Sequence, residues 1–291
     1  MRVVVMWSGG KDSQACLIHS VKKYGSKNVI AVFCDTGWEH DITISHVKNV
    51  AESIGVELVH LVPKMKFDEL CIHKHIFPNG TRRFCTIELK IKPFIDWILS
   101  QDESFIIVQG IRASESLKRA EYQVECDYFV EYHTGKAKYR KKDVLEWVRN
   151  HDASVIRPIF DWSAQQVIDY ILDNGQRPNE LYERGCSRVG CFPCVYARIN
   201  EIKAVANDET YRNRLIRLEK DVTEAITRKG VTANFFQTGK IPKRFCHTNE
   251  NKSPTVEEVF DYVTRNDNVN SLFDFEDEGL SCISMYHGLC E

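Results

Sequence analysis

Four short runs of apolar residues occur in the first 110 residues, and segments with apolar side chains at every third or fourth position follow them. The runs predict buried strands, and the recurring pattern predicts amphipathic helices. The predicted strands cover residues 3–6, 28–34, 56–62 and 104–109. The predicted helices cover residues 14–24 and 41–54, a segment that opens at 81–85, and a segment from Ser163 to Gly175. Strands that alternate with helices indicate an α/β fold with a doubly wound parallel sheet.

The last third of the chain is predicted to be helical. Apolar residues from Tyr211 to Ile226 share one helical face that ends near Gly230, and Ser253-Pro254 starts a second helix. From Asn266 the tail is acidic and is expected to be partly mobile. We therefore expect a main domain over residues 1–200 and a helical C-terminal region with an acidic tail over residues 201–291.

Two segments are expected to be less regular. Residues 66–85 are rich in Lys, His and Arg and indicate a loop or lid. Residues 126–142 are expected to form an exposed β-hairpin or excursion that carries a basic cluster. The members of this cluster are Lys136, Lys138, Arg140, Lys141 and Lys142. Such a run is either a solvated face or a contact for the backbone of a nucleic acid.

The sequence Ser-Gly-Gly-Lys-Asp-Ser at residues 8–13 lies between the first strand and the first helix. Paired glycines let a ligand approach the backbone closely, and the start of a helix attracts anions, so phosphate is the expected ligand. The common mononucleotide loop is excluded, because it needs glycine in place of Val5 and Ser or Thr in place of Asp12. The alternative is an ordinary glycine turn capped by Asp12 or Ser13.

Ligands of doubly wound sheets bind at the carboxyl ends of the strands. Asp35 follows the second predicted strand, and Arg112 follows the fourth. Asp12 or Asp35 is expected to contact Mg²⁺, although Asp35 could instead cap the loop or helix that follows it. Arg112 offers a charged fork to phosphate or sulfate, with Glu115 orienting it.

Cys186, Cys191 and Cys194 have the spacing Cys-x4-Cys-x2-Cys, which suits one metal centre. A fourth ligand has to come from elsewhere, and Cys85 is the candidate because of its neighbours Arg83 and Thr86. The centre would be a [4Fe–4S] cluster, or Zn²⁺ if it is structural. Alternatively, Cys186 is a small buried hydrophobe and the other two form a plain dithiol.

Composition limits the function classes only weakly. The chain has 291 residues and 43% apolar content, enough for a large core, and its formal net charge of −2 does not indicate a nucleic-acid-binding protein by itself. Eleven cysteines without a recognisable signal peptide or a membrane-length apolar stretch indicate a reducing cytoplasm and no membrane association. Metal or redox use of some cysteines is therefore expected rather than disulfides.

Taken together, the motifs resemble the phosphoadenosine phosphosulfate reductase family of the adenine nucleotide α-hydrolase-like, PP-loop superfamily. The resemblance covers residues 1–200, which would form the nucleotide-binding domain. It rests on Ser8–Ser13, Asp35-Thr36-Gly37, Arg83-Phe84-Cys85 with Lys90 and Pro93, Gly110-Ile111-Arg112 with Glu115-Ser116 and Arg119, Pro158 with Asp161-Trp162, and Gly190-Cys191-Phe192-Pro193-Cys194.

The sequence departs from the reductases of this family in two places. The reductase loop lacks the lysine, whereas Lys11 is present here. The reductases also carry a nucleophilic cysteine in a Lys-Thr-Glu-Cys-Gly-Leu-His type of tail, and residues 287–291 do not match its order. Both departures favour the ATP-using relatives, namely the small subunit of sulfate adenylyltransferase and the adenylating enzymes of tRNA thiolation and DNA phosphorothioation.

The resemblance implies an ATP pyrophosphatase that adenylates an acceptor oxygen, so that sulfur can later displace AMP. Lys11, Asp12, Asp35 and Arg112 would be catalytic. The nucleotide would also contact Ser8, Gly9, Gly10, Ser13 and Arg119. The expected partners are a tRNA or DNA acceptor and a cysteine desulfurase or thioredoxin-like donor. The alternatives are a reductase that releases sulfite from adenylyl sulfate or phosphoadenylyl sulfate, and a non-catalytic nucleotide or cluster sensor.

Overall fold

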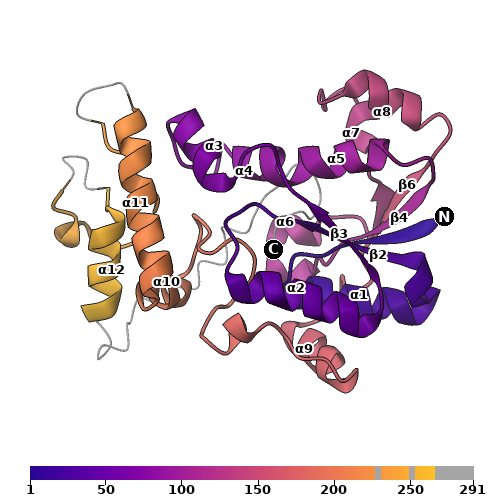
Figure 1. Cartoon of the computed structure of the whole chain (residues 1–291), viewed down its shortest axis with the longest axis horizontal. Coiled ribbons are helices and arrows are strands. Elements are labelled where there is room, and N and C mark those ends of the chain that lie inside the picture. Colours follow the sequence, from indigo (N-terminus) through magenta and orange to yellow (C-terminus); the bar gives the residue numbers. More distant parts are fainter. Residues whose placement is uncertain (227–230, 249–252, 266–291) are drawn as a thin grey trace.

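The computed structural model describes residues 1–226, 231–248 and 253–265, and within these residues six strands form one sheet (Figure 1). The strands are β1 (Arg2–Met6), β2 (Val29–Cys34), β3 (Glu57–Leu61), β4 (Phe105–Val108), β5 (Glu125–Asp127) and β6 (Ala153–Ile156). Their order across the sheet is β3-β2-β1-β4-β6-β5. All neighbours are parallel except β5, which runs antiparallel to β6. The four predicted strands are confirmed, and β5 and β6 were not predicted.

Helices cover both faces of the sheet, as a doubly wound fold requires. One face carries α1 (Lys11–Tyr24), α2 (Asp41–Ile54) and α9 (Ala164–Asp173), and the other carries α5 (Lys92–Leu99), α7 (Val130–His133) and α8 (Lys141–Trp147). Side chains alternate along a strand, so each strand supplies both cores. In β1, Val3 and Val5 enter the core under α1, whereas Val4 and Met6 enter the core under α5.

The order in which the chain adds strands to the sheet reverses between β1 and β4. The chain places β2 and β3 on one side of β1 and then returns to place β4 on the other side. A crevice at the carboxyl ends of such strands is the usual ligand site. Here the loop after β4 lies directly against the start of α1, because a Cβ atom on Gly110 would come within 2.8 Å of the backbone carbon of Asp12 and the backbone nitrogen of Ser13. Only glycine fits at this position.

A third core lies beside the sheet. It joins α3 (Phe67–Lys74) to the C-terminal helices α10 (Ile199–Ala206), α11 (Glu209–Ala225) and α12 (Val256–Arg265), which stand apart from the sheet in Figure 1. Trp38, Cys186 and Phe192 belong to the same core. Residue 200, the expected domain boundary, falls within α10. The acidic tail from Asn266 lies outside the described residues.

Two segments differ from the expectation. Residues 66–85 were expected to be irregular, but they contain α3, because Phe67, Leu70 and Cys71 share one buried face. Residues 126–142 form no hairpin. The end of β5 is followed by α7 and by the start of α8, because Phe129 and Tyr132 turn toward the core at helical spacing. The remaining short elements are α4 (Phe84–Thr86), α6 (Leu117–Ala120), a π-helical turn η2 (Ile87–Ile91), and the 3₁₀ turns η1 (Ser26–Asn28), η3 (Ala113–Glu115), η4 (Glu180–Tyr182) and η5 (Lys243–Phe245).

Glu219 on α11 links two later segments of the C-terminal region to this helix. Its two carboxylate oxygens accept hydrogen bonds from the backbone N–H groups of Phe235 and Val256, at 2.9 and 2.8 Å. Burial raises the pKa of Glu219 to about 7 despite these hydrogen bonds. The folded protein therefore binds a proton here more tightly than the unfolded chain does.

A raised pKa of this kind makes stability fall as the pH rises from about 4.5 to about 7. We expect the wild type to lose up to about 3 kcal/mol of unfolding free energy across this window relative to Glu219→Gln, which cannot titrate. Urea unfolding of both proteins at pH 5 and pH 8 measures the difference, and contributions common to both proteins cancel. Parallel pH dependences would contradict the assignment.

Candidate functional site

The loop between β1 and α1 is a compact, internally hydrogen-bonded turn. The Oγ atoms of Ser8 and Ser13 are 3.0 Å apart, and the Ser13 hydroxyl donates to the carbonyl of Gly10 at 2.9 Å. Gly9 has φ of +83°, and a Cβ there would lie 2.6 Å from Cγ2 of Thr43. Gly10 is the N-cap of α1, and the Ser13 hydroxyl accepts a hydrogen bond from the backbone N–H of Ser8 at 3.2 Å. The Ser13 side chain thus ties the turn to the start of α1, as the alternative interpretation expected, and phosphate binding at this turn stays a prediction.

A buried carboxylate joins two cations across the crevice. Asp12 accepts from Nζ of Lys11 at 2.9 Å through one oxygen and from Nε of Arg112 at 2.6 Å through the other. The three residues are 1%, 8% and 7% exposed, in the order Asp12, Lys11, Arg112. The group thus holds two positive charges and one negative charge where the loops after β1 and β4 meet, which favours an anion.

Glu115 has a different role from the one expected. Its carboxylate accepts from the backbone N–H of Arg112 at 3.0 Å and pairs with the guanidinium of Arg119. Asp12, rather than Glu115, orients the guanidinium of Arg112. Arg119 is itself buried, and its ion pair with Glu115 stabilises the loop after β4.

Asp35 lies on the same rim but outside the pocket lining. One carboxylate oxygen accepts from the backbone N–H of Gly37 at 2.8 Å, and the other lies 2.9 Å from Nε2 of His60. These contacts fix the loop after β2, as the alternative interpretation of Asp35 expected. A contact of Asp12 or Asp35 with Mg²⁺ stays a prediction.

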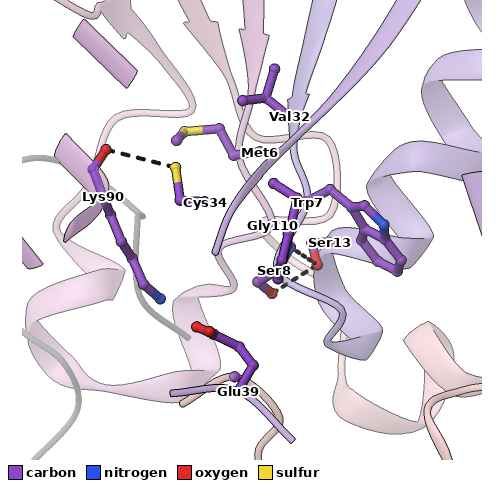
Figure 2. A pocket seen from close by; sticks show the side chains of 11 residues that line it. Met6, Trp7, Ser8, Ser13, Val32, Cys34, Glu39, Lys90 and Gly110 are labelled. Atoms are coloured by element: carbon purple, nitrogen blue, oxygen red, sulfur yellow. Dashed lines mark hydrogen bonds between the residues drawn. The ribbon is translucent and has the colours of Figure 1, made fainter. Parts of the chain in front are cut away.

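A pocket of about 500 Å³, part of it open to solvent, lies at the carboxyl ends of β1, β2 and β4 (Figure 2). Its lining consists of Met6, Trp7, Ser8, Ser13, Val32, Phe33, Cys34, Glu39, Lys90, Gly110 and Gly190. The side chains from the strand ends make one wall apolar. Figure 2 shows the ammonium group of Lys90 and the carboxylate of Glu39 pointing toward one another on the side opposite Ser8 and Ser13.

Glu39 and Lys90 were not predicted as site residues. Burial raises the pKa of Glu39, and the charge of Lys90 opposes that shift. The oxygens of Glu39 accept from the backbone N–H and the hydroxyl of Thr36 at 3.0 and 2.7 Å. Lys90 lies on the π-helical turn η2, a local widening that is frequent at functional sites. Lys90 is one of the residues on which the family resemblance rests, and Glu39 follows the Asp35-Thr36-Gly37 motif by two residues, but neither was assigned a role in the site.

Two further residues, outside the motifs, contact the turn at residues 8–13, which we call the phosphate loop after its expected ligand. The hydroxyl of Tyr182 accepts from the backbone N–H of Lys11 at 2.9 Å, and its ring lies 5.5 Å from Nζ of that lysine. The side chain of Asn179 donates to the carbonyl of Gly9 at 3.3 Å. The segment around η4 therefore contacts residues 9–11 of this loop through two side chains.

The four candidate cysteines lie in or against the third core, but they do not form a ligand set as they stand. Among the described residues, no three or more His, Cys, Asp or Glu side chains gather where they could hold a metal ion. Burial raises the pKa of Cys186 to about 11, so its thiol is neutral. Sγ of Cys191 lies 3.9 Å from Oγ1 of Thr36 and 4.0 Å from Oε1 of Glu39.

The sequence matches the phosphoadenosine phosphosulfate reductase domain over residues 2–197. The chain belongs to the phosphoadenosine phosphosulfate reductase family. It is thus a member of a family of nucleotide-binding enzymes, and the expected resemblance is confirmed. The matched part of the chain contains the whole sheet and every residue described above around the pocket. Within the described residues, none of the helices is both long and apolar enough to span a membrane.

Three proteins similar to this family member differ in how much of the chain they match. An uncharacterised 37.8 kDa protein of Escherichia phage 186 is 29% identical and is matched over 99% of this chain and 96% of its own length. The adenosine 5'-phosphosulfate reductase of Oceanobacillus iheyensis is 25% identical over 58% of this chain and 62% of its own length. A phosphoadenylyl-sulfate reductase structure from Candida auris has a TM-score of 0.45 and 18% identity, over 66% of this chain and 83% of that chain.

Proposed function

We propose that this protein is an ATP pyrophosphatase that adenylates an acceptor for sulfur incorporation. The observation that carries the proposal is the position of Lys11 at the start of α1, where Asp12 holds its ammonium group. Lys11 does not line the pocket itself, but Ser8 and Ser13, which flank it in the same loop, do. A fixed cation at a helix start suits a leaving pyrophosphate, whereas a sulfonucleotide has no pyrophosphate for it to hold.

The two walls of the pocket suit the two ends of ATP. The apolar side chains of Met6, Val32 and Cys34 suit the faces and edges of a purine. Ser8 and Ser13 lie at the other wall, next to the glycine turn, and suit the β- and γ-phosphates. In this orientation the α-phosphate would lie between the two loops that Asp12 and Arg112 join.

In the proposed reaction an acceptor oxygen attacks the α-phosphorus, and the bond from that phosphorus to the oxygen bridging the β-phosphate breaks. The products are an adenylated acceptor and pyrophosphate, which takes the electron pair of the broken bond. Lys11 would offset the charge that grows on the pyrophosphate, and Arg112 would stabilise the α-phosphoryl group. A sulfur nucleophile from a cysteine desulfurase or a thioredoxin-like donor would later displace AMP.

The proposed acceptor is a nucleic acid, tRNA or DNA. Lys136, Lys138, Lys141 and Lys142 are exposed, whereas Arg140 is paired with Asp96 and Asp143. This surface packs against the start of α5, because Nζ of Lys92 lies 5.0 Å from the ring of Tyr139. Exposed lysines of this kind suit phosphate backbones.

A product assay separates the candidate functions. Pyrophosphate release from ATP, measured alone and with tRNA or DNA, tests the proposed reaction and its acceptor. The similarity to the Oceanobacillus reductase favours the second candidate, and sulfite release from adenylyl sulfate with thioredoxin, without any pyrophosphate release from ATP, would decide for it. Tight ATP binding without cleavage of ATP would indicate a sensor.

We also propose that Cys85, Cys186, Cys191 and Cys194 bind a [4Fe–4S] cluster, or Zn²⁺ in its place. The spacing of the last three cysteines supports this, and a ligand set would require the side chains to move together. Anaerobically purified protein is expected to be brown and to contain about four iron atoms per chain. Cys191→Ser should lose the colour and the iron, while the matched control Cys126→Ser should keep both. A colourless protein with one zinc per chain would refute the cluster.

A further inference from the structure

Helix α11 lies beyond the family match, yet its first turns contact the loop between β2 and α2. We call residues 36–41 the rim loop, because Glu39 within it lines the pocket. The hydroxyl of Tyr211 accepts from the backbone N–H of Asp41 at 2.9 Å, and the Tyr211 ring stacks on His40 with ring centres 4.3 Å apart. The C-terminal region is therefore in direct contact with a wall of the nucleotide site.

Arg214 makes the most extensive of these contacts. Its Nη2 donates to the carbonyl of Gly37 at 2.5 Å and lies 3.7 Å from a carboxylate oxygen of Asp68 on α3. Its guanidinium carbon lies 4.1 Å from the centre of the Trp38 ring. One planar cation thus joins α11, α3 and the rim loop, and it covers the indole in a cation–π contact.

Hydrogen bonds within and around the rim loop connect Trp38 to the pocket residue Glu39 and to the segment around Phe192. The backbone N–H of Trp38 donates to Oε2 of Glu39 at 3.2 Å, and its indole N–H donates to the carbonyl of Pro193 at 3.0 Å. The carbonyl of Trp38 accepts from the backbone N–H of Phe192 at 2.7 Å. A shift of Trp38 would therefore move both Glu39 and the segment that carries Cys191.

We infer that Arg214 is a positioning residue for the nucleotide pocket, acting through Gly37 and Trp38 on Glu39. Arg214 does not line the pocket itself. The inference rests on the proposed function only in taking an adenine nucleotide as the ligand. It gives the C-terminal helices, which the family match leaves out, an indirect part in nucleotide binding.

The test compares Arg214→Ala, Arg214→Lys and a matched control, Arg217→Ala, which removes an exposed arginine from the same helix. In Arg214→Ala, amide hydrogen exchange should accelerate about tenfold in a peptide that covers the rim loop, and the affinity for α,β-methylene-ATP or adenylyl sulfate should fall about tenfold. Arg214→Lys should restore only part of both, because an ammonium group lacks the planar fork. Arg217→Ala should match the wild type.

Steady-state kinetics add a readout that a general loss of stability does not imitate. KM should rise in Arg214→Ala while kcat changes little, because the groups around Lys11 are untouched. Exchange that stays at the wild-type rate in the rim loop would overturn the inference, and so would faster exchange with unchanged nucleotide affinity. If the wild type binds neither nucleotide, the proposed function fails, and the exchange rates alone decide whether Arg214 holds the loop.

Discussion

Pyrophosphate release from ATP should fall by a factor on the order of one hundred to one thousand when Lys11 is replaced by alanine. The ammonium group is buried, fixed by Asp12 and adjacent to the phosphate loop, so it is already in place when charge develops on the leaving group. A cation that needs no rearrangement stabilises the transition state more than the bound substrate. The loss should therefore appear in kcat, with a smaller change in KM.

Two further variants, a matched control and a conservative substitution, accompany Lys11→Ala in this experiment. Lys48→Ala removes an exposed lysine from α2 and should leave the rate unchanged. Lys11→Arg keeps the charge but not its exact position, so we expect it to retain part of the rate. Turnover of Lys11→Ala equal to that of the wild type would remove Lys11 from the reaction. Circular dichroism on each variant separates a lost reaction from a lost fold.

Asp12→Ala should destabilise the protein by about 3–5 kcal/mol. The substitution leaves the charges of Lys11 and Arg112 buried without the carboxylate that both contact, and removing one partner from a buried ionic group carries a cost of this size. Asp12→Asn keeps one acceptor oxygen and should lose less. Urea unfolding at pH 7 measures the free energy of each variant.

The control for this experiment is Asp173→Ala, an exposed aspartate at the end of α9, whose unfolding free energy should stay within about 0.5 kcal/mol of the wild type. A loss below about 1 kcal/mol in Asp12→Ala would mean that water replaces the carboxylate at both cations. The three charges would then not act as one group, and Asp12 would not set the position of Lys11.

The fold could be predicted where the signal is local. The buried strands of the sheet have continuous apolar runs, and α2 and α9 show their buried faces at helical spacing. β5 has three residues and pairs only through its antiparallel contact with β6, so nothing within it distinguishes it from a loop. In α3, three buried residues decide the helix, and the charged residues around them hide the pattern.

The site could be predicted only in part for the same reason. The phosphate loop is a local device of glycines at a strand-to-helix junction, so the sequence indicates it directly. Glu39 and Lys90 face one pocket only because the rim loop and the π-helical turn η2 bring them there. Contacts of this kind depend on packing between distant segments, and no spacing within either segment encodes them.

The hydrogen bond between Lys11 and Tyr182 has a consequence for how the protein is made. The phosphate loop is complete in sequence by residue 13, but the side chains of Asn179 and Tyr182 that close it are synthesised some 170 residues later. A nascent chain that ends before Asn179 already holds every strand of the sheet described here. Such a chain can begin to form its sheet during synthesis, yet its phosphate loop stays unfinished until the ribosome has passed Tyr182.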